Sequence, residues 1–306
     1  MKKFSLLPFF VALLLVPSLH AAPKEITGIF DAGWNSFFRD SSGWDKQCER
    51  IRSLGMNTVI FQYSIEYPNT NYVFNNFDWA EGLRDEQHLE IAVPAAERHD
   101  LEIFIGLYAE NQDWWFANDE YLDRQKVRMI QTIELFETKF PSSSVVGYYI
   151  PHEIARYYWH KPADLARLKG KFLKPVVDYI HQNTNKKVLI SPFFNPDLAT
   201  ATEIEEFFYA LLDSLEIDIL ALQDGVASMP SRIPRYGEYI RGVSRSAQAH
   251  GVDFWLNIEI FKDNEDPAYG GPSGMELTDR IRLQIDTANT LPHCSKWISY
   301  DYSSIT

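Results

Sequence analysis

The sequence predicts an α/β fold, a single-domain (β/α)8 barrel. Short runs rich in β-branched and aromatic residues alternate along the chain with longer segments of helical period, which is the pattern of a parallel sheet covered by helices. Eight such runs occur in 306 residues, and both the strand number and the length are typical of this barrel. The expected strands are residues 26–32, 58–63, 102–108, 145–150, 187–192, 217–223, 253–258 and 296–300.

Helices are expected between successive strands. The segment 119–140 shows this most clearly, because its apolar residues recur from Met129 to Phe140 at the spacing of helical turns. Such a stripe indicates one face buried against a sheet. The sequence reaches Thr306 soon after the eighth strand, so the barrel is expected to lack its last outer helix. The expected helices are residues 43–54, 83–99, 119–140, 162–182, 200–214, 235–249 and 275–289.

Residues 1–21 are predicted to be a signal peptide, which leaves residues 22–306 as the barrel domain. Two lysines near the start precede an almost unbroken apolar run at residues 6–16, as in secretory signals. The run is shorter than the ~20 apolar residues that a spanning helix needs, which disfavours an uncleaved membrane anchor. We expect cleavage after Ala21, or after Ala22, and a periplasmic or secreted protein that no membrane segment retains.

The composition favours some partners over others. The formal net charge is −13, and the Lys and Arg residues form no dense cluster. A field of this sign repels nucleic acid and anionic lipid, so nucleic-acid binding is disfavoured. Aromatic residues make up 14% of the chain, and aromatic rings on loops suit the flat apolar faces of sugars. The composition leaves the oligomeric state open.

The cysteines and histidines do not indicate a metal site. The sequence contains no CxxC, HxH or HExxH spacing, so no metal or other cofactor is expected. Cys48 and Cys294 are the two cysteines. They could pair in an oxidising compartment or stay apart as buried thiols, and both alternatives remain open.

Polar and aromatic side chains follow every expected strand at its carboxyl end. In (β/α)8 barrels the chemistry takes place at that end, so these side chains are expected to converge on one rim. A barrel filled only for stability would not need amides and carboxylates there. The candidate substrate-binding residues are Trp34, Gln62, Tyr63, Tyr108, Trp114, Tyr149, His152, Asn195, Gln223, Asp224, Asn257 and Asp301.

Glu153 and Glu259 are the candidate catalytic residues. Glu153 comes shortly after the strand 145–150, and Glu259 directly extends the apolar strand 253–258. Burying a carboxylate is costly unless it is paired or functional. Glycoside hydrolysis needs two carboxyl groups that face each other across the sugar. One is a general acid, and the other is a nucleophile or base.

Each of these carboxylates also has a purely structural explanation. Glu153 could pair with Arg156, and Glu259 could form a salt bridge to a neighbouring Lys or Arg. Asp224 is a third candidate, because it stands before Gly225 at the end of a strand. It could bind a substrate hydroxyl, orient a catalytic group or act as a catalytic carboxylate, although Asp before Gly is also common in turns.

Three segments carry a resemblance to a known family. They are residues 30–35 with Trp44 and 54–63, residues 147–153, and residues 222–226. On these segments the chain resembles the DUF4434-type barrels, a family of exported bacterial proteins grouped with glycoside-hydrolase TIM barrels. The resemblance implies a TIM barrel and glycosidase chemistry. Retaining-glycosidase barrels place the acid/base and the nucleophile after strands 4 and 7. They often have Asn before the strand-4 Glu, where this chain has His152.

These observations predict a glycoside hydrolase that acts on a poly- or oligosaccharide by a two-carboxylate retaining mechanism. Glu153 would be the general acid/base and Glu259 the nucleophile. The alternative is a non-catalytic carbohydrate-binding barrel, accessory to polysaccharide export or processing, which would not need a close carboxylate pair. A metal-dependent hydrolase would require clustered His and Asp ligands, which the sequence does not show.

Overall fold

The computed structural model describes residues 25–31, 40–62, 64–67, 88–110, 118–230 and 233–300. The predicted signal peptide, residues 1–21, lies outside these residues. Four candidate substrate-binding residues also lie outside them, namely Trp34, Tyr63, Trp114 and Asp301.

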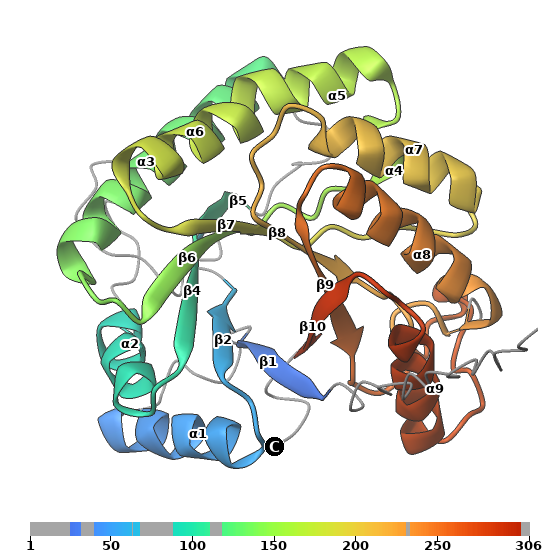
Figure 1. The fold of residues 1–306 in the computed structure, drawn as a ribbon, viewed down its shortest axis with the longest axis horizontal. Helices are drawn as coiled ribbons and strands as arrows, with labels where there is room; N and C mark the ends of the chain where they lie inside the picture. Colours follow the sequence, from blue (N-terminus) through green and yellow to red (C-terminus); the bar gives the residue numbers. More distant parts are fainter. Residues whose placement is uncertain are drawn as a thin grey trace, which may run out of the picture.

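Eight parallel strands close into one barrel, in the order β1-β10-β9-β8-β7-β6-β4-β2 (Figure 1). The first strand pairs with the last, Gly28 lying opposite Ile298, so the barrel has no open edge. This arrangement confirms the predicted (β/α)8 fold. The barrel strands are β1 Ile26–Asp31, β2 Thr58–Phe61, β4 Glu102–Gly106, β6 Val145–Ile150, β7 Lys187–Ile190, β8 Ile219–Gln223, β9 Asp253–Glu259 and β10 Cys294–Tyr300.

Helices surround the barrel as an outer ring (Figure 1). The described residues end at Tyr300 with β10, and among them no helix follows that strand. In the same residues, no helix is both long and apolar enough to cross a bilayer. The ring consists of α1 Ser41–Ser53, α2 His88–Arg98, α3 Asp119–Lys139, α5 Pro162–Leu168, α6 Lys174–Asn183, α7 Ala201–Leu212, α8 Ile233–Ala249 and α9 Leu277–Asn289.

Two details differ from the expected elements. The predicted helix 162–182 contains a π-helical turn, η3 Lys169–Leu173, between α5 and α6. The predicted strand 102–108 stops at Gly106, and the chain then enters a second sheet of two strands, β3 Ile65–Tyr67 and β5 Tyr108–Glu110. A Cβ atom on Gly106 would lie 2.0 Å from the carbonyl oxygen of Gln62, so only glycine permits the close approach at which the chain leaves the barrel.

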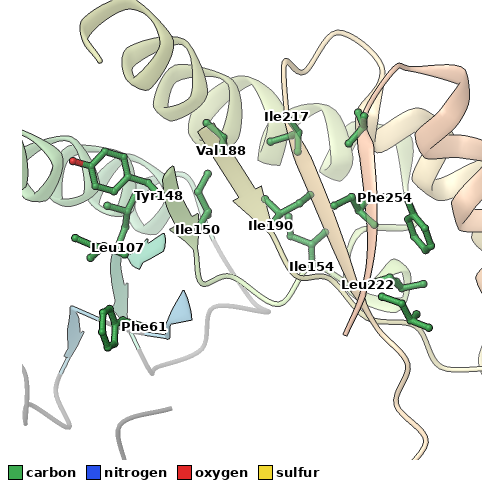
Figure 2. Packing of buried hydrophobic residues seen from close by; sticks show 14 of the residues in the cluster. Phe61, Leu107, Tyr148, Ile150, Ile154, Val188, Ile190, Ile217, Leu222 and Phe254 are labelled. Atoms are coloured by element: carbon green, nitrogen blue, oxygen red, sulfur yellow. The ribbon is translucent and has the colours of Figure 1, made fainter. Parts of the chain in front are cut away.

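The core has two layers that follow from the alternation of side chains along each strand. In β9, Phe254, Leu256 and Ile258 belong to the layer between sheet and helices. Figure 2 shows part of this outer layer, including Ile150 and Ile190. Trp255 belongs to the inner layer that fills the barrel. Each large apolar side chain buried in this way contributes roughly 1.5–3 kcal/mol.

The structure describes both cysteines as buried thiols. Cys48 lies on α1 and Cys294 begins β10. The Cys294 Sγ atom donates to the carbonyl oxygen of Lys296 at 3.4 Å.

Candidate active site

A cavity of about 140 Å³ opens at the carboxyl end of the barrel. We call it the mouth cavity. Six of the predicted site residues line it, namely Gln62, Tyr149, Glu153, Gln223, Asn257 and Glu259. Both candidate catalytic carboxylates are therefore at one site. The same cavity is also lined by Phe30, Ser191, Ser228, Phe261 and Tyr300.

Strand alternation explains why these side chains face inward. Trp255 fills the barrel interior, and with a period of two Asn257 and Glu259 point the same way. Neighbouring β8 is in register, because Gln223 lies opposite Asn257. The lower layers of the barrel are apolar and the last layer is polar, so the polar groups collect at the mouth.

Glu153 lies just beyond β6, and no strand partner fixes its position. Its Oε1 atom is 3.5 Å from the Gln223 Nε2 atom, and that amide also donates to the carbonyl oxygen of Ser191 at 2.8 Å. Burial raises the pKa of Glu153, and the Gln223 contact partly opposes this. Arg156, the suggested structural partner, instead forms an ion pair with Glu203 at 2.7 Å. The side chain of Glu153 is thus left facing the cavity.

Glu259 is held by a single residue at both carboxyl oxygens. Ser228 donates its main-chain N–H to Oε2 at 2.8 Å and its hydroxyl to Oε1 at 3.0 Å. Burial, followed by the charge of Asp224, raises the pKa of Glu259 to about 8, and the Ser228 donors oppose both effects. The suggested salt bridge to Lys or Arg is not found among the ion pairs of the described residues.

Asp224 lies behind Glu259 and does not line the mouth cavity. Only 3% of it is exposed. Its Oδ1 atom accepts from the main-chain N–H of Glu259 and that of Val226, both at 3.2 Å. Its Oδ2 atom accepts from the side chain of Gln284 at 2.6 Å. Burial raises the pKa of Asp224 to about 6, although the hydrogen bonds from these donors lower it. Asp224 therefore holds the main chain of Glu259 and raises the pKa of its carboxyl group, and it does not face the cavity itself.

Helix α9 fixes the end of β9 from outside the barrel. Arg280 is completely buried. It donates to the carbonyl oxygen of Glu259 at 3.0 Å and forms an ion pair with Asp263 at 2.7 Å. Gln284 also donates to the carbonyl oxygen of Glu259, at 3.2 Å. The main chain that carries Glu259 is therefore fixed by two side chains of one helix.

Asn257 carries an unsatisfied acceptor into the cavity. Its Nδ2 atom is 3.5 Å from the Ser191 hydroxyl. Its Oδ1 atom is buried and has no hydrogen-bond partner among the described residues. A buried polar atom without a partner is costly, so this oxygen marks a position where a ligand hydroxyl could donate.

Besides Asp224, three other predicted substrate-binding residues lie away from the mouth cavity. Tyr108 is buried and donates to Glu110 at 3.3 Å. The His152 ring lies 4.6 Å from that of Phe172, and burial lowers its pKa to about 3. The Asn195 side chain accepts from the main-chain N–H of Asp197 at 3.0 Å, which stabilises a turn.

Five of the residues that line the cavity are not among the predicted site residues. Alternation could have identified two of them, because Ser191 follows the inward-facing Leu189 and Tyr300 follows Ile298 by two positions. The Tyr300 hydroxyl donates to Gln62 Oε1 at 3.1 Å. Ser228 lies in the segment between β8 and α8, where no periodic pattern predicts which way a side chain points.

A larger groove of about 590 Å³ lies on the outside of the barrel, between the α5–α6 segment and α7. Arg156 and Glu203 line it and neutralise each other by their ion pair. The groove is not at the carboxyl ends of the strands, so the mouth cavity is the better candidate active site.

One protein family and several solved structures are similar to this chain, and the likeness concerns its family and its fold. The family model described as "Domain of unknown function (DUF4434)" matches residues 26–306. The search of curated proteins found no match.

Several solved structures share the fold. A candidate alpha-L-fucosidase from Bacteroides thetaiotaomicron VPI-5482 superposes with a TM-score of 0.71 at 18% identity, over 92% of this chain and 90% of that one. The endo-1,4-beta-D-mannanase of Thermotoga petrophila RKU-1 gives 0.64 at 13% identity, over 90% and 88%. The endo-1,4-beta-mannanase of Rhizomucor miehei gives 0.56 at 13%, over 93% and 88%. These barrels are glycosidase-like, and at such identities the likeness concerns the fold alone.

Proposed function

Because the chain belongs to the DUF4434 family and its barrel resembles those of glycosidases, we propose that it is a glycoside hydrolase acting on a poly- or oligosaccharide. One observation carries the proposal: Glu153 and Glu259 line the same cavity at the barrel mouth. They come from β6 and β9, which β7 and β8 separate around the barrel. Two carboxyl groups on different sides of one cavity can flank a glycosidic bond.

Glu153 is the proposed general acid and base. In the first step it gives its proton to the glycosidic oxygen while Glu259 attacks the anomeric carbon, and the bond between that carbon and the leaving oxygen breaks. In the second step Glu153 takes a proton from water, whose oxygen displaces Glu259 from the sugar. The chain returns to its starting protonation state after each cycle.

The surroundings of the two carboxyl groups fit these roles. The two Ser228 donors satisfy both oxygens of Glu259 and stabilise its ionised, nucleophilic form. Glu153 has one long contact to Gln223, and burial raises its pKa, which favours the protonated form that an acid needs. Because the pKa of Glu259 is about 8, we expect activity to rise towards neutral and mildly alkaline pH.

Five other residues would bind sugar hydroxyls or pack against the ring in the mouth cavity. The free Oδ1 atom of Asn257 would accept from a hydroxyl, and Gln223 and Gln62 offer amides. Tyr149 and Phe30 lie with ring centroids 5.2 Å apart and supply an apolar wall at its base.

The protein is also proposed to be exported. The predicted cleavage site after Ala21 would release residues 22–306 into the periplasm or the medium. The test is the intact mass of the protein recovered from a bacterial host that expresses the full sequence. A mass that still includes residues 1–21 would contradict export by a cleaved signal.

The proposed function is tested by incubating purified protein with fucosides, mannans, glucans and other polysaccharides and measuring the release of reducing ends. Release from at least one of them, with the initial product anomer matching the substrate by NMR, is the expected result. Retention of a polysaccharide without any cleavage would instead favour the non-catalytic carbohydrate-binding barrel.

A further inference from the structure

Three aromatic side chains lie on connections that follow the carboxyl ends of barrel strands, as Glu153 does. Tyr157 lies on α4 Arg156–Trp159, Phe193 follows β7, and Tyr269 ends the short helix η5 Pro267–Tyr269. The rings of Tyr157 and Phe193 meet edge to face, with centroids 5.7 Å apart. We call these three residues the rim aromatics. They come from three different strand-to-helix connections, so the barrel fold brings them together.

The rim aromatics are near the proposed acid. Burial raises the pKa of Tyr157, and so do its neighbour Tyr158 and the charges of Glu153 and Tyr269. Geometry places two of these rings there as well. Ile154, which directly follows Glu153, accepts a hydrogen bond from the main-chain N–H of Phe193, and the Phe193 ring contacts that of Tyr157.

The segments that carry these rings are held by hydrogen bonds in the structure. The main-chain N–H of Phe193 donates to the carbonyl oxygen of Ile154 at 3.2 Å, which joins the β6 and β7 connections. In the β9–α9 connection, Asn264 N–H donates to the Ala227 carbonyl oxygen at 2.8 Å. Ser273 N–H donates to Asp263 Oδ2, also at 2.8 Å. A ligand would therefore meet rings carried on segments whose main chain is already held in place, which lowers the entropic cost of binding.

The exposure of these rings does not suit a purely structural role. Tyr157 and Phe193 are only partly buried, and Tyr269 is 50% exposed. Tyrosine combines a flat apolar face with a polar edge, and a sugar ring has the same combination of an apolar face and peripheral hydroxyls. The rings therefore offer a surface to a sugar bound next to the mouth cavity.

We propose that Tyr157, Phe193 and Tyr269 form a stacking subsite for a sugar ring on the Glu153 side of the mouth cavity. The subsite rests on the proposed function in one respect: Glu153 protonates the leaving oxygen, so the stacked ring belongs to the leaving group. The substrate class that follows is a saccharide chain with at least one residue beyond the cleaved bond. A simple glycoside with a small leaving group would not use this subsite.

The test is affinity electrophoresis of folded protein in gels containing soluble mannan, hydroxyethylcellulose, xylan, fucoidan, alginate or dextran. The Glu153→Gln protein is used so that the polysaccharide is not cleaved during the run. Tyr269→Ala and Tyr157→Ala are each introduced into it. Tyr209→Ala is the matched control, because Tyr209 is 53% exposed and lies on α7. Reducing-end release by wild-type protein on the same polysaccharides is measured in parallel.

We expect at least one polysaccharide to retard the protein. Both rim variants should weaken the apparent affinity by about tenfold, the effect of losing a ring that anchors a ligand, and Tyr209→Ala should leave it unchanged. Equal retardation of the rim variants and their parent would overturn the subsite, even if wild-type protein cleaves the polysaccharide. Loss of retardation in the rim variants without any cleavage by wild type would support the subsite and reject hydrolysis. Absence of retardation in every gel would overturn the subsite.

Discussion

Gln284 donates a hydrogen bond of 2.6 Å to Asp224 Oδ2, and through it a helix outside the barrel reaches the carboxylate behind Glu259. The same amide donates to the carbonyl oxygen of Glu259. Asp224 in turn accepts from the main-chain N–H of Glu259. Both the main-chain N–H and the carbonyl oxygen of the proposed nucleophile are thus hydrogen-bonded. Its pKa also depends on Asp224, a buried neighbour that does not line the mouth cavity.

Replacing Gln284 by Leu should destabilise the protein by about 1–3 kcal/mol, because Asp224 Oδ2 then stays buried without its donor. The free energy of unfolding is measured with urea at pH 7. Gln248→Leu is the control, since Gln248 lies on the exposed face of α8. Equal stability of the Gln284 variant and wild type would mean that this contact is not important to the fold.

Asp224→Asn should move the acid limb of the kcat/KM profile to lower pH. The negative charge of Asp224 raises the pKa of Glu259, so its removal lets Glu259 ionise at lower pH. The profile is recorded between pH 4 and 10 on a cleaved polysaccharide, with Asp178→Asn on α6 as control. An acid limb that stays at the same pH, or moves to higher pH, would contradict the electrostatic coupling between the two carboxyl groups.

Glu259 should also make stability depend on pH. Its pKa is about 8 in the folded protein and about 4.3 in an unfolded chain, so the folded state holds the extra proton between these values. The free energy of unfolding should therefore fall as pH rises from 5 to 9. In Glu259→Gln the fall should be smaller. Parallel pH dependences of the two proteins would show that Glu259 ionises normally.

Asn257→Leu tests whether the cavity is shaped for a ligand. The substitution removes a buried acceptor that has no partner among the described residues, so thermal stability should hold or rise. The KM for a cleaved saccharide should rise, because the proposed hydroxyl contact is lost. Loss of stability with an unchanged KM would assign Asn257 to the fold instead of to binding.

Much of the fold could be predicted because it follows from periodic patterns. The alternation in β9 puts Asn257 and Glu259 on the same inner face as Trp255, and the order of residues is enough to show this. The same rule extends through the inward Tyr149 to Glu153, although the strand itself stops at Ile150. Both carboxylates of the candidate site could be predicted for this reason.

The rest depended on tertiary contacts that no local pattern reports. Tyr108 follows Gly106, where the chain leaves the barrel for the second sheet, so strand position no longer predicts its direction. His152 turns outward to pack on Phe172 of the π-helical turn. Ser228 reaches Glu259 from a connection without periodicity. Gln284 looks like an ordinary helix residue until α9 is placed against β8 and β9.

The most direct test of the central claim is the turnover of Glu153→Gln and Glu259→Gln on a saccharide that wild type cleaves. Glu216→Gln serves as the control, because the Glu216 side chain is 77% exposed and lies next to His181, outside the mouth cavity. If the two residues are the catalytic pair, each substitution lowers kcat by at least about 10²-fold, both proteins remain folded, and the control keeps wild-type turnover. A folded Glu153→Gln or Glu259→Gln protein with near wild-type kcat would contradict the assignment.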